Sequence, residues 1–346
     1  MRDCKKFCWK KSPKNITPPP VDYSKKYLTF EALEDTIFTF SQNALQYSID
    51  NGSTWTILNA GTSTPTITAG NKILWKQTGL TPDENGIGRF SSTGEYNAYG
   101  NVMSLYYGDD FENKTDLTEK DYAFAELFFE NINLVDVSNL VLPATTLSIE
   151  CYAGMFQGCT SLTTAPSLPA TTLANYCYDS MFYGCTSLTT AHALPATTLA
   201  EGCYANMFDS CTSLTSAPEL PATILANYCY QSMFNGCTSL TTAPELPATT
   251  LVEYCYSGMF YNCTSLTEAP ELPATTLITN CYYGMFQGCT NLNYIKCLAT
   301  NIPATNCTDN WVNGVASSGT FVKDASMSSW TTGSSGIPSG WTVESA

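Results

Sequence analysis

Cysteine is the residue type with the most chemical potential in this sequence, and its spacing is regular. The chain has sixteen cysteines; twelve of them form pairs eight residues apart, beginning with Cys151 and Cys159 and recurring every 26 residues. A cysteine attacks as its thiolate, which usually needs a neighbouring base. The only histidine, His192, stands where most other copies of the repeat have proline. The sequence therefore predicts neither Cys-His nor Ser-His-Asp catalysis.

Other patterns that could hold a metal or a cofactor are incomplete. Cys4 and Cys8 resemble half of a metal site, but no second pair lies nearby. The acidic stretch 108–116 lacks the alternation and the final glutamate of a calcium-binding loop. No glycine-rich phosphate loop precedes a helix. A hydrolase with paired carboxylates stays formally open, but nothing singles out two carboxylates. We therefore expect no metal, no cofactor and no enzymatic activity.

A row of glutamates is the first candidate for binding. Its members occupy the seventeenth position of successive repeats, where earlier repeats have Ser167 and Ala193. They are Glu219, Glu245 and Glu271. Stacked about one strand apart, like charges repel each other. The row should therefore favour a cationic partner or bound cations, unless it is ordinary soluble surface.

A row of tyrosines at the last position of the repeat is the second candidate. The row is Tyr176, Tyr228 and Tyr254, and Gly202 interrupts it. Exposed tyrosines in register can stack on sugar rings or anchor a protein contact at a low cost in entropy. Ordinary soluble surface is again the alternative.

The elements that position these residues follow from a repeat of fixed length. CYAGMFQGCTSLTTAPSLPATTLANY (151–176) recurs, with small changes, from residues 177, 203, 229, 255 and 281, without an insertion. A fixed period of this length indicates a solenoid, in which each unit packs on its neighbours. Copies stacked about 4.8 Å apart would place Leu162 beneath Leu188 and Leu214. A continuous file of buried leucines is therefore expected.

Within a unit, the apolar spacing predicts a change of backbone state. Cys151, Met155 and Cys159 are four residues apart, which predicts one stripe of a short helix. The threonine-rich run that follows predicts short extended segments interrupted by prolines. Paired cysteines along such a helix would lie about 12 Å apart, too far for a disulfide. Reduced, buried thiols are expected; bridges between adjacent coils stay open.

The repeat units resemble a known family. MFQGCTSLTTAP, MFYGCTSLTTAH and MFNGCTSLTTAP are similar to BspA-type leucine-rich repeats, which occur in surface proteins and in phage or prophage products of Bacteroidetes. The resemblance covers about residues 27–346. It implies a leucine-rich-repeat solenoid used for adhesion or recognition, without catalysis, and it supplies no ligand residues. The predicted fold is thus α+β: a solenoid of 26-residue repeats preceded by a small antiparallel β domain.

The two ends of the chain differ in charge. Residues 1–26 hold eight basic and two acidic side chains, which leaves seven basic and twenty-eight acidic residues for the rest. An acidic body argues against nucleic acid as a partner. No apolar stretch is long enough for a signal peptide or a membrane span. Residues 1–26, with Pro18–Pro20, are interpreted as a basic, proline-rich tail and linker that attaches the protein to a virion or surface assembly.

The flanks of the repeats have their own patterns. Residues 27–108 contain five short β-prone runs: 36–40, 45–49, 54–58, 65–69 and 72–76. They suggest a sandwich-like domain with one hairpin that resembles the Asp box, SIDNGSTW (48–55). That motif also occurs in sialidases, which hold their substrate with three arginines; this chain has two, so the hairpin is interpreted as structural.

Degenerate repeats are predicted to close both ends of the array. Residues 109–150 are interpreted as an N-terminal cap, residues 151–306 as six leucine-rich repeats and residues 307–346 as a C-terminal cap. In the last, Trp311 and Val312 take the positions of the repeat's methionine and phenylalanine.

These observations predict a non-enzymatic adhesion or recognition protein that presents its repeats to a protein or glycan of a host or bacterial surface. It would be extracellular, on a cell surface or on a virion. The first alternative is a virion-associated fibre, decoration or host-attachment protein of a Bacteroidetes phage. The second is a structural surface protein without a specific ligand.

Overall fold

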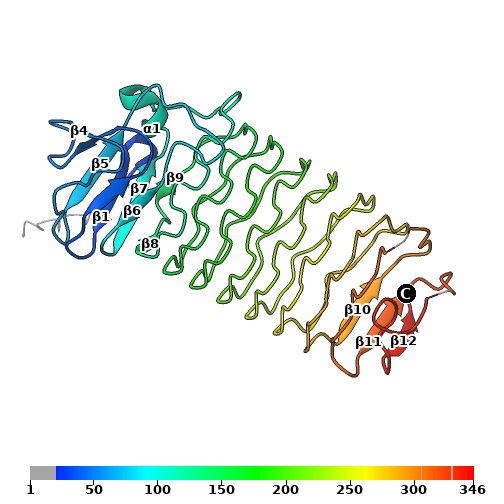
Figure 1. The fold of residues 1–346 in the computed structure, drawn as a ribbon. Coiled ribbons are helices and arrows are strands. Elements are labelled where there is room, and N and C mark those ends of the chain that lie inside the picture. Colours follow the sequence, from blue (N-terminus) through cyan, green and yellow to red (C-terminus); the bar gives the residue numbers. More distant parts are fainter. Residues whose placement is uncertain (1–20, 305, 329) are drawn as a thin grey trace, which may run out of the picture.

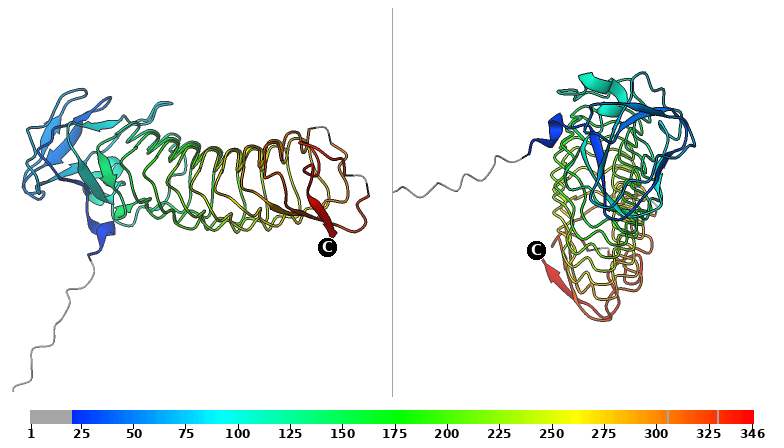
Figure 2. Two further views of the ribbon diagram at one scale, coloured as in Figure 1. Left: turned by 90° about the horizontal axis from the view of Figure 1, so that it is seen from below. Right: turned by 90° about the vertical axis from the view of Figure 1, so that its left-hand side faces the viewer.

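The computed structural model describes residues 21–304, 306–328 and 330–346. It is elongated: a β-sheet lies at one end, a stack of coils forms the body, and a small sheet lies at the other end (Figures 1 and 2). The molecule is rich in repeats, bridges and short strands, and it contains few helices. Residues 1–20 of the tail predicted over residues 1–26, with Cys4, Cys8 and Pro18–Pro20, lie outside the described residues.

The first sheet consists of strands from residues 28–141. Its order is β4-β3-β5-β1-β7-β8, and β9 also pairs with β7. The pairs among β4, β3, β5, β1 and β7 are antiparallel, whereas β7 pairs in parallel with β8 and β9. The strands are β1 (Leu28–Ala32), β3 (Leu45–Ser48), β4 (Thr56–Leu58), β5 (Lys72–Lys76), β7 (Tyr96–Asn101), β8 (Leu134–Asp136) and β9 (Leu140–Val141). The sheet therefore includes residues beyond the predicted β domain.

Smaller elements complete this end. Strands β2 (Phe38–Phe40) and β6 (Phe90–Ser92) form a separate antiparallel pair. The strand predicted at residues 65–69 is wrong, because Ile67 makes only a single bridge with Thr36. Three short helical turns, η1 (Tyr23–Lys25), α1 (Ser104–Tyr107) and η2 (Gly108–Asp110), flank the sheet.

The Asp-box-like hairpin joins β3 to β4. Asp50 accepts hydrogen bonds from the backbone N–H of Thr54 (2.9 Å), the Thr54 hydroxyl (2.6 Å) and the Ser48 hydroxyl (2.7 Å). These bonds, chiefly those from Thr54, lower the pKa of Asp50 to about 2. A carboxylate used in this way closes the turn. Asp50 therefore has a structural role in this hairpin.

The helix predicted at the start of each repeat is wrong. Residues 149–158 form successive turns, in which the N–H of Met155 donates to the carbonyl of Tyr152 (3.3 Å) and the N–H of Cys159 donates to that of Phe156 (3.1 Å). Gly154 and Gly158 have positive φ values of 57° and 73°. A left-handed residue at every fourth position interrupts a right-handed helix. We call this segment, in each repeat, the turn ribbon.

The turn ribbon is held by the next coil. The N–H of Phe156 donates to the carbonyl of Met181 (2.9 Å), and the N–H of Gly158 donates to that of Tyr183 (2.8 Å). Alternate N–H groups therefore bond within a coil and between coils. Two residues point inward and the next two point outward, so the period is four. A helix also places residues four apart on one side, so the same spacing led to the prediction of a helix.

The core consists of files of identical side chains. The rings of Phe156, Phe182 and Phe208 stack with centroids 5.4 Å apart, and the tyrosines that follow each first cysteine stack in a parallel file. The leucines predicted to lie in one file are all completely buried: Leu162, Leu188, Leu214, Leu240, Leu266 and Leu292. The hydrophobic cluster runs without a break from the first sheet to the last.

The fourteen cysteines that the structure describes are free and buried. The thiol of Cys185 donates to the carbonyl of Phe156 (3.1 Å), and the equivalent thiols of Cys211 and Cys237 do the same in the following coils. Burial raises the pKa of Cys185 and Cys211 well above the ordinary value for a thiol. Protonated, hydrogen-bonded thiols are poor nucleophiles. The thiol files act as core side chains.

The extended half of each repeat forms isolated bridges, such as Thr164 with Thr190 and Ser216 with Thr242. Prolines follow these bridges, at the sixteenth position of four repeats and the nineteenth position of five, and they lack the N–H group that a ladder would need. At the C-terminal end, a parallel sheet does form from β10 (Tyr294–Cys297), β11 (Thr320–Lys323) and β12 (Thr342–Ser345).

Both ends of the coil stack are closed by aromatic side chains. Phe124 and Phe128 stack on Tyr152 and Phe156 at the first end. Trp311 stacks on Tyr282 at the other end, with ring centroids 6.1 Å apart, and its N–H donates to the carbonyl of Gly336 (2.8 Å). The last coil is thereby covered. In the part of the chain that the structure describes, no helix is long and apolar enough to cross a membrane.

Candidate functional site

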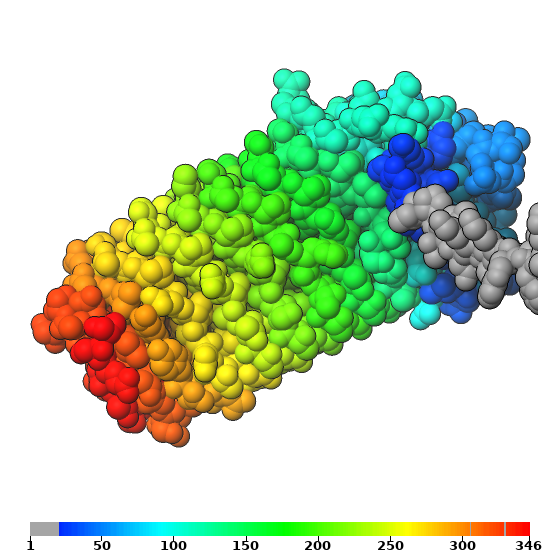
Figure 3. Space-filling model, turned by 180° about the vertical axis from the view of Figure 1, so that it is seen from behind, coloured from blue at the N-terminus to red at the C-terminus, as the bar shows by residue number. Residues whose placement is uncertain are grey.

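The outward side of the turn ribbons is the surface on which the repeats differ most. Inward positions keep cysteine, tyrosine, methionine and phenylalanine in all six copies, whereas the third, fourth, seventh and last two positions vary. We call this surface the ribbon face. Figure 3 shows the coils packed against one another without a gap along the molecule. A ligand would therefore meet a continuous surface across several coils.

The candidate tyrosines lie in one row on the ribbon face, and two of them stack. The rings of Tyr228 and Tyr254 lie 4.8 Å apart at an angle of 18°. Tyr176 extends over the next coil, because a Cβ atom at Gly202 would lie only 2.2 Å from its ring. Gly202 therefore leaves the space that the ring of Tyr176 fills. We call these three tyrosines the tyrosine file; it spans four coils.

The expectation that these tyrosines are exposed is corrected, because all three are half-buried. Stacking covers the ring faces of Tyr228 and Tyr254 that face each other. The hydroxyl of Tyr176 donates to Glu201 (3.2 Å), and burial, followed by this carboxylate, raises the pKa of Tyr176. Covered faces do not favour the stacking of a sugar ring. Edges and hydroxyl groups are better suited to contacts with a protein.

The backbone of the tyrosine file is unusual. Tyr176, Tyr228 and Tyr254 have φ values of 55°, 61° and 57°. Residues other than glycine, asparagine and aspartate rarely adopt this left-handed conformation. The corresponding residues of later coils, Asn280 and Asn306, have φ values of 56° and 59°. Asparagine is therefore the natural replacement at these positions.

A ladder of carboxylates and amides lies on the same turn ribbons, and sequence reasoning missed it. The side chain of Asn206 donates to Asp179 (3.2 Å), and that of Asn235 donates to Asp209 (2.8 Å). Burial raises the pKa of both aspartates. In the sequence, only the variation at the third, fourth and seventh positions marks these residues. It does not show which of them form hydrogen bonds between coils.

Other tyrosines make the ribbon face more aromatic than the tyrosine file alone. Tyr183 is 40% exposed and Tyr283 is 44% exposed, and Tyr261 occupies the same seventh position as Tyr183. Large exposed aromatic side chains are enriched at recognition surfaces. They widen the candidate surface beyond the predicted residues.

The glutamate row lies on the proline-rich segment. Glu219, Glu245 and Glu271 are exposed. Shallow hollows of about 390 and 470 Å³ lie between successive glutamates, and prolines line them. Lys296 of the next coil pairs with Glu271 at 3.0 Å, which sequence reasoning did not predict. Among the described residues, no contact joins this row to the tyrosine file.

Replacing Glu219 and Glu245 by glutamine should slightly raise the free energy of unfolding at low salt. Adjacent carboxylates repel, and salt screens the repulsion. Glu271→Gln should instead lower the free energy of unfolding by less than about 1 kcal/mol, because it removes the exposed ion pair with Lys296. Urea unfolding at low and high salt measures both effects. A clear loss of stability in the first variant would show that its carboxylates are paired.

The remaining predicted chemical residues do not converge. His192 is exposed. Asp109, in the acidic stretch considered for calcium, accepts hydrogen bonds from Lys76 (2.6 Å) and the Tyr27 hydroxyl (2.8 Å), which lower its pKa. Within residues 21–304, 306–328 and 330–346, no group of three or more histidine, cysteine or acidic residues is placed to hold a metal ion.

Comparison with known proteins places the repeats in a family. A model of the BspA type leucine rich repeat region matches residues 122–243 and 203–306, with six copies. No curated protein and no solved structure matches the chain. The two matches together span more than half of the chain. The chain therefore belongs to the BspA-type leucine-rich-repeat family.

Proposed function

We propose that this protein is a non-enzymatic adhesion or recognition protein that binds a surface protein or glycan through the ribbon face. The family supports a role in interactions made by repeats at a surface. The observation that carries the proposal is that the tyrosine file and the Asp179–Asn206 and Asp209–Asn235 pairs lie on the same turn ribbons. Aromatic anchors next to fixed polar groups are typical of binding surfaces.

Two features favour a protein over a glycan as the partner. The faces that Tyr228 and Tyr254 turn toward each other are covered, so they offer less open ring surface to a sugar than two separate rings would. The ribbon-face positions of residues 151–306 include no lysine or arginine and four acidic residues, so a partner with basic residues would be attracted; the four are Asp179, Glu201, Asp209 and Glu253. Tyrosines that neighbours already hold in place lose little entropy on binding. We therefore infer a basic surface protein as the preferred partner, with an extracellular or virion-surface location.

The test is a screen of the full chain against arrays of surface proteins and glycans. The matched variant replaces Tyr176, Tyr228 and Tyr254 by asparagine, which the backbone tolerates at Asn280 and Asn306. The control variant replaces Glu219, Glu245 and Glu271 by glutamine. A partner should bind the native chain and the control, and binding should weaken about tenfold or more in the tyrosine variant. Loss of binding only in the glutamate variant would place the site on the glutamate row.

A virion-associated role is the second candidate. The specific observation is the contrast between the basic residues 1–26 and the acidic remainder of the chain. A basic tail can dock electrostatically into an assembly. Capsid and tail genes beside this gene would favour this role, whereas an export system would favour a cellular surface. Ordered self-assembly, with no binding in the screen, would favour the structural alternative.

A further inference from the structure

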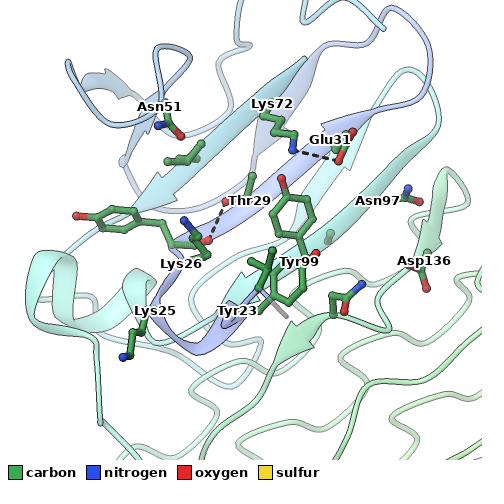
Figure 4. A pocket seen from close by; sticks show the side chains of 15 residues that line it. Tyr23, Lys25, Lys26, Thr29, Glu31, Asn51, Lys72, Asn97, Tyr99 and Asp136 are labelled. Carbon is green, nitrogen blue, oxygen red and sulfur yellow. Dashed lines mark hydrogen bonds and ion pairs between the residues drawn. The ribbon is translucent and has the colours of Figure 1, made fainter. Parts of the chain in front are cut away.

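A hollow of about 510 Å³ lies on the outward face of the first sheet, where strands β5, β1 and β7 run side by side (Figure 4). The opposite face of these strands carries buried Phe30, Ile73 and other core residues. Turn η1 borders the hollow on one side, the Asp-box-like hairpin contributes Asn51, strand β8 contributes Asp136, and the segment between β8 and β9 contributes Asn139. The volume is within the range of small-ligand sites.

The charged groups of the hollow are mostly neutralised by neighbours. Lys72 pairs with Glu31 at 3.6 Å, and Lys25 pairs with Asp22 at 3.6 Å. Asp136 accepts hydrogen bonds from the N–H (3.0 Å) and the hydroxyl (2.9 Å) of Ser138. Among the described lining residues, Lys26 is the charged side chain without an ion-pair or hydrogen-bond partner. One ammonium group is thus left for a ligand.

Uncharged groups complete the lining. Tyr99 is the register partner of Thr29 across strands β1 and β7, and the ammonium of Lys72 lies 5.4 Å from the centroid of its ring (Figure 4). The ring of Tyr23 meets that of Tyr99 edge to face, with centroids 5.3 Å apart. The amide oxygen of Asn97 accepts no hydrogen bond from the described residues. Asn51 and Asn139 add further amides, which can donate and accept hydrogen bonds.

This composition excludes several ligand classes. Val21, Leu74 and Ala98 are the only aliphatic side chains among the described lining residues, too few for a lipid or another apolar ligand. One unpaired lysine is too little for a polyphosphate, which needs clustered cations. Side-chain amides, a hydroxyl-bearing aromatic ring and a single ammonium match adjacent sugar hydroxyls and one acidic group.

We propose that this hollow binds a short saccharide that carries one acidic group, with Lys26 contacting the acidic group and Tyr99 contacting a sugar ring. The site is separate from the ribbon face, so either one can fail without the other. A single chain would then bind two partners, a saccharide at the N-terminal sheet and a surface protein along the coils.

Isothermal titration calorimetry of the full chain tests the site with three probes: sialyllactose, a trisaccharide with one carboxylate, neutral fucosyllactose and acetate. Sialyllactose should bind at least about tenfold more tightly than fucosyllactose, because it adds a charge-assisted contact to Lys26. Acetate should not bind measurably. Absence of binding by both sugars would overturn the proposal, as would binding of acetate as tight as that of sialyllactose.

Variants assign the contacts. Lys26→Gln should remove the preference for sialyllactose, and Tyr99→Leu should weaken the binding of both sugars about tenfold. Lys114→Gln is the matched control, because Lys114 lies outside the hollow, near the ring of Tyr107. Thermal unfolding verifies that each variant is folded; Lys26 is exposed, so its replacement tests the site even where Tyr99→Leu fails to fold. Unchanged affinities in Lys26→Gln would contradict the assignment.

Discussion

Leu214→Asp is expected to destabilise the coil array by more than about 4 kcal/mol. Leu214 is completely buried, with equivalent leucines in the coils before and after it. An aspartate there would leave a carboxylate without a partner in an apolar core, and it would also remove packing from two neighbouring coils. The effect should exceed that of any surface substitution in the repeats.

Thermal and urea unfolding, followed by circular dichroism, measure this effect. Thr215→Asp is the matched control, because Thr215 is the next residue and is exposed. It should change the free energy of unfolding by less than about 0.5 kcal/mol. Equal melting temperatures for Leu214→Asp and the native chain would contradict the register of the leucine file.

The protein should lose stability steeply above pH 9. Burial raises the pKa of the cysteine thiols in the folded chain; for Cys151, Cys289 and Cys297 it is about 12. An unfolded thiol ionises near its ordinary pKa of about 8.5 to 9. The contribution of each thiol is therefore fully present below that pH and is lost as the pH rises toward the folded value. Between these two pKa values, the free energy of unfolding falls by up to about 1.4 kcal/mol per thiol for each pH unit.

Fourteen buried thiols act together in this window. Their summed effect exceeds the stability of about 5 to 15 kcal/mol that is typical of a domain. A chain with Cys4→Ser and Cys8→Ser should resist a thiol reagent at pH 8, unfold near pH 10 and then react fully. Replacing Cys185, Cys211 and Cys237 by alanine should make the alkaline transition shallower. Rapid reaction of the thiols at pH 8 would show that they are accessible in the folded chain.

The repeat and its inward residues could be identified from the sequence because the same residue types recur at these positions in every copy. Leu162 and its equivalents in the other repeats are buried as expected. The backbone of the turn ribbon was mistaken because residues four apart share a side both in a helix and in successive turns. Gly154 and Gly158 carried the distinguishing signal: small or amide residues recur at these two positions in every copy, where the φ angle is positive.

The candidate site was predictable only in part. The rows of tyrosines and glutamates could be located by alignment of the copies, but the contacts between coils could not. Gly202 appeared as a gap in the tyrosine row, although it provides the space for the ring of Tyr176. Lys296 belongs to the coil that follows Glu271. Their ion pair depends on how these two coils are placed relative to each other, which the sequence does not give. The hollow on the first sheet combines residues as distant in sequence as Tyr23 and Asn139.

The left-handed residues of the turn ribbon restrict how the ribbon face can diversify. At the last, fourth and eighth positions, the six repeats use only tyrosine, glycine, serine and asparagine, all with positive φ values. Branched side chains such as valine and isoleucine would be strained there. The third and seventh positions are free of this constraint and hold alanine, aspartate, glutamine, serine, tyrosine or asparagine. New binding specificities can therefore evolve by exchange of small, amide and aromatic residues at these positions in successive repeats, while the backbone conformation stays the same.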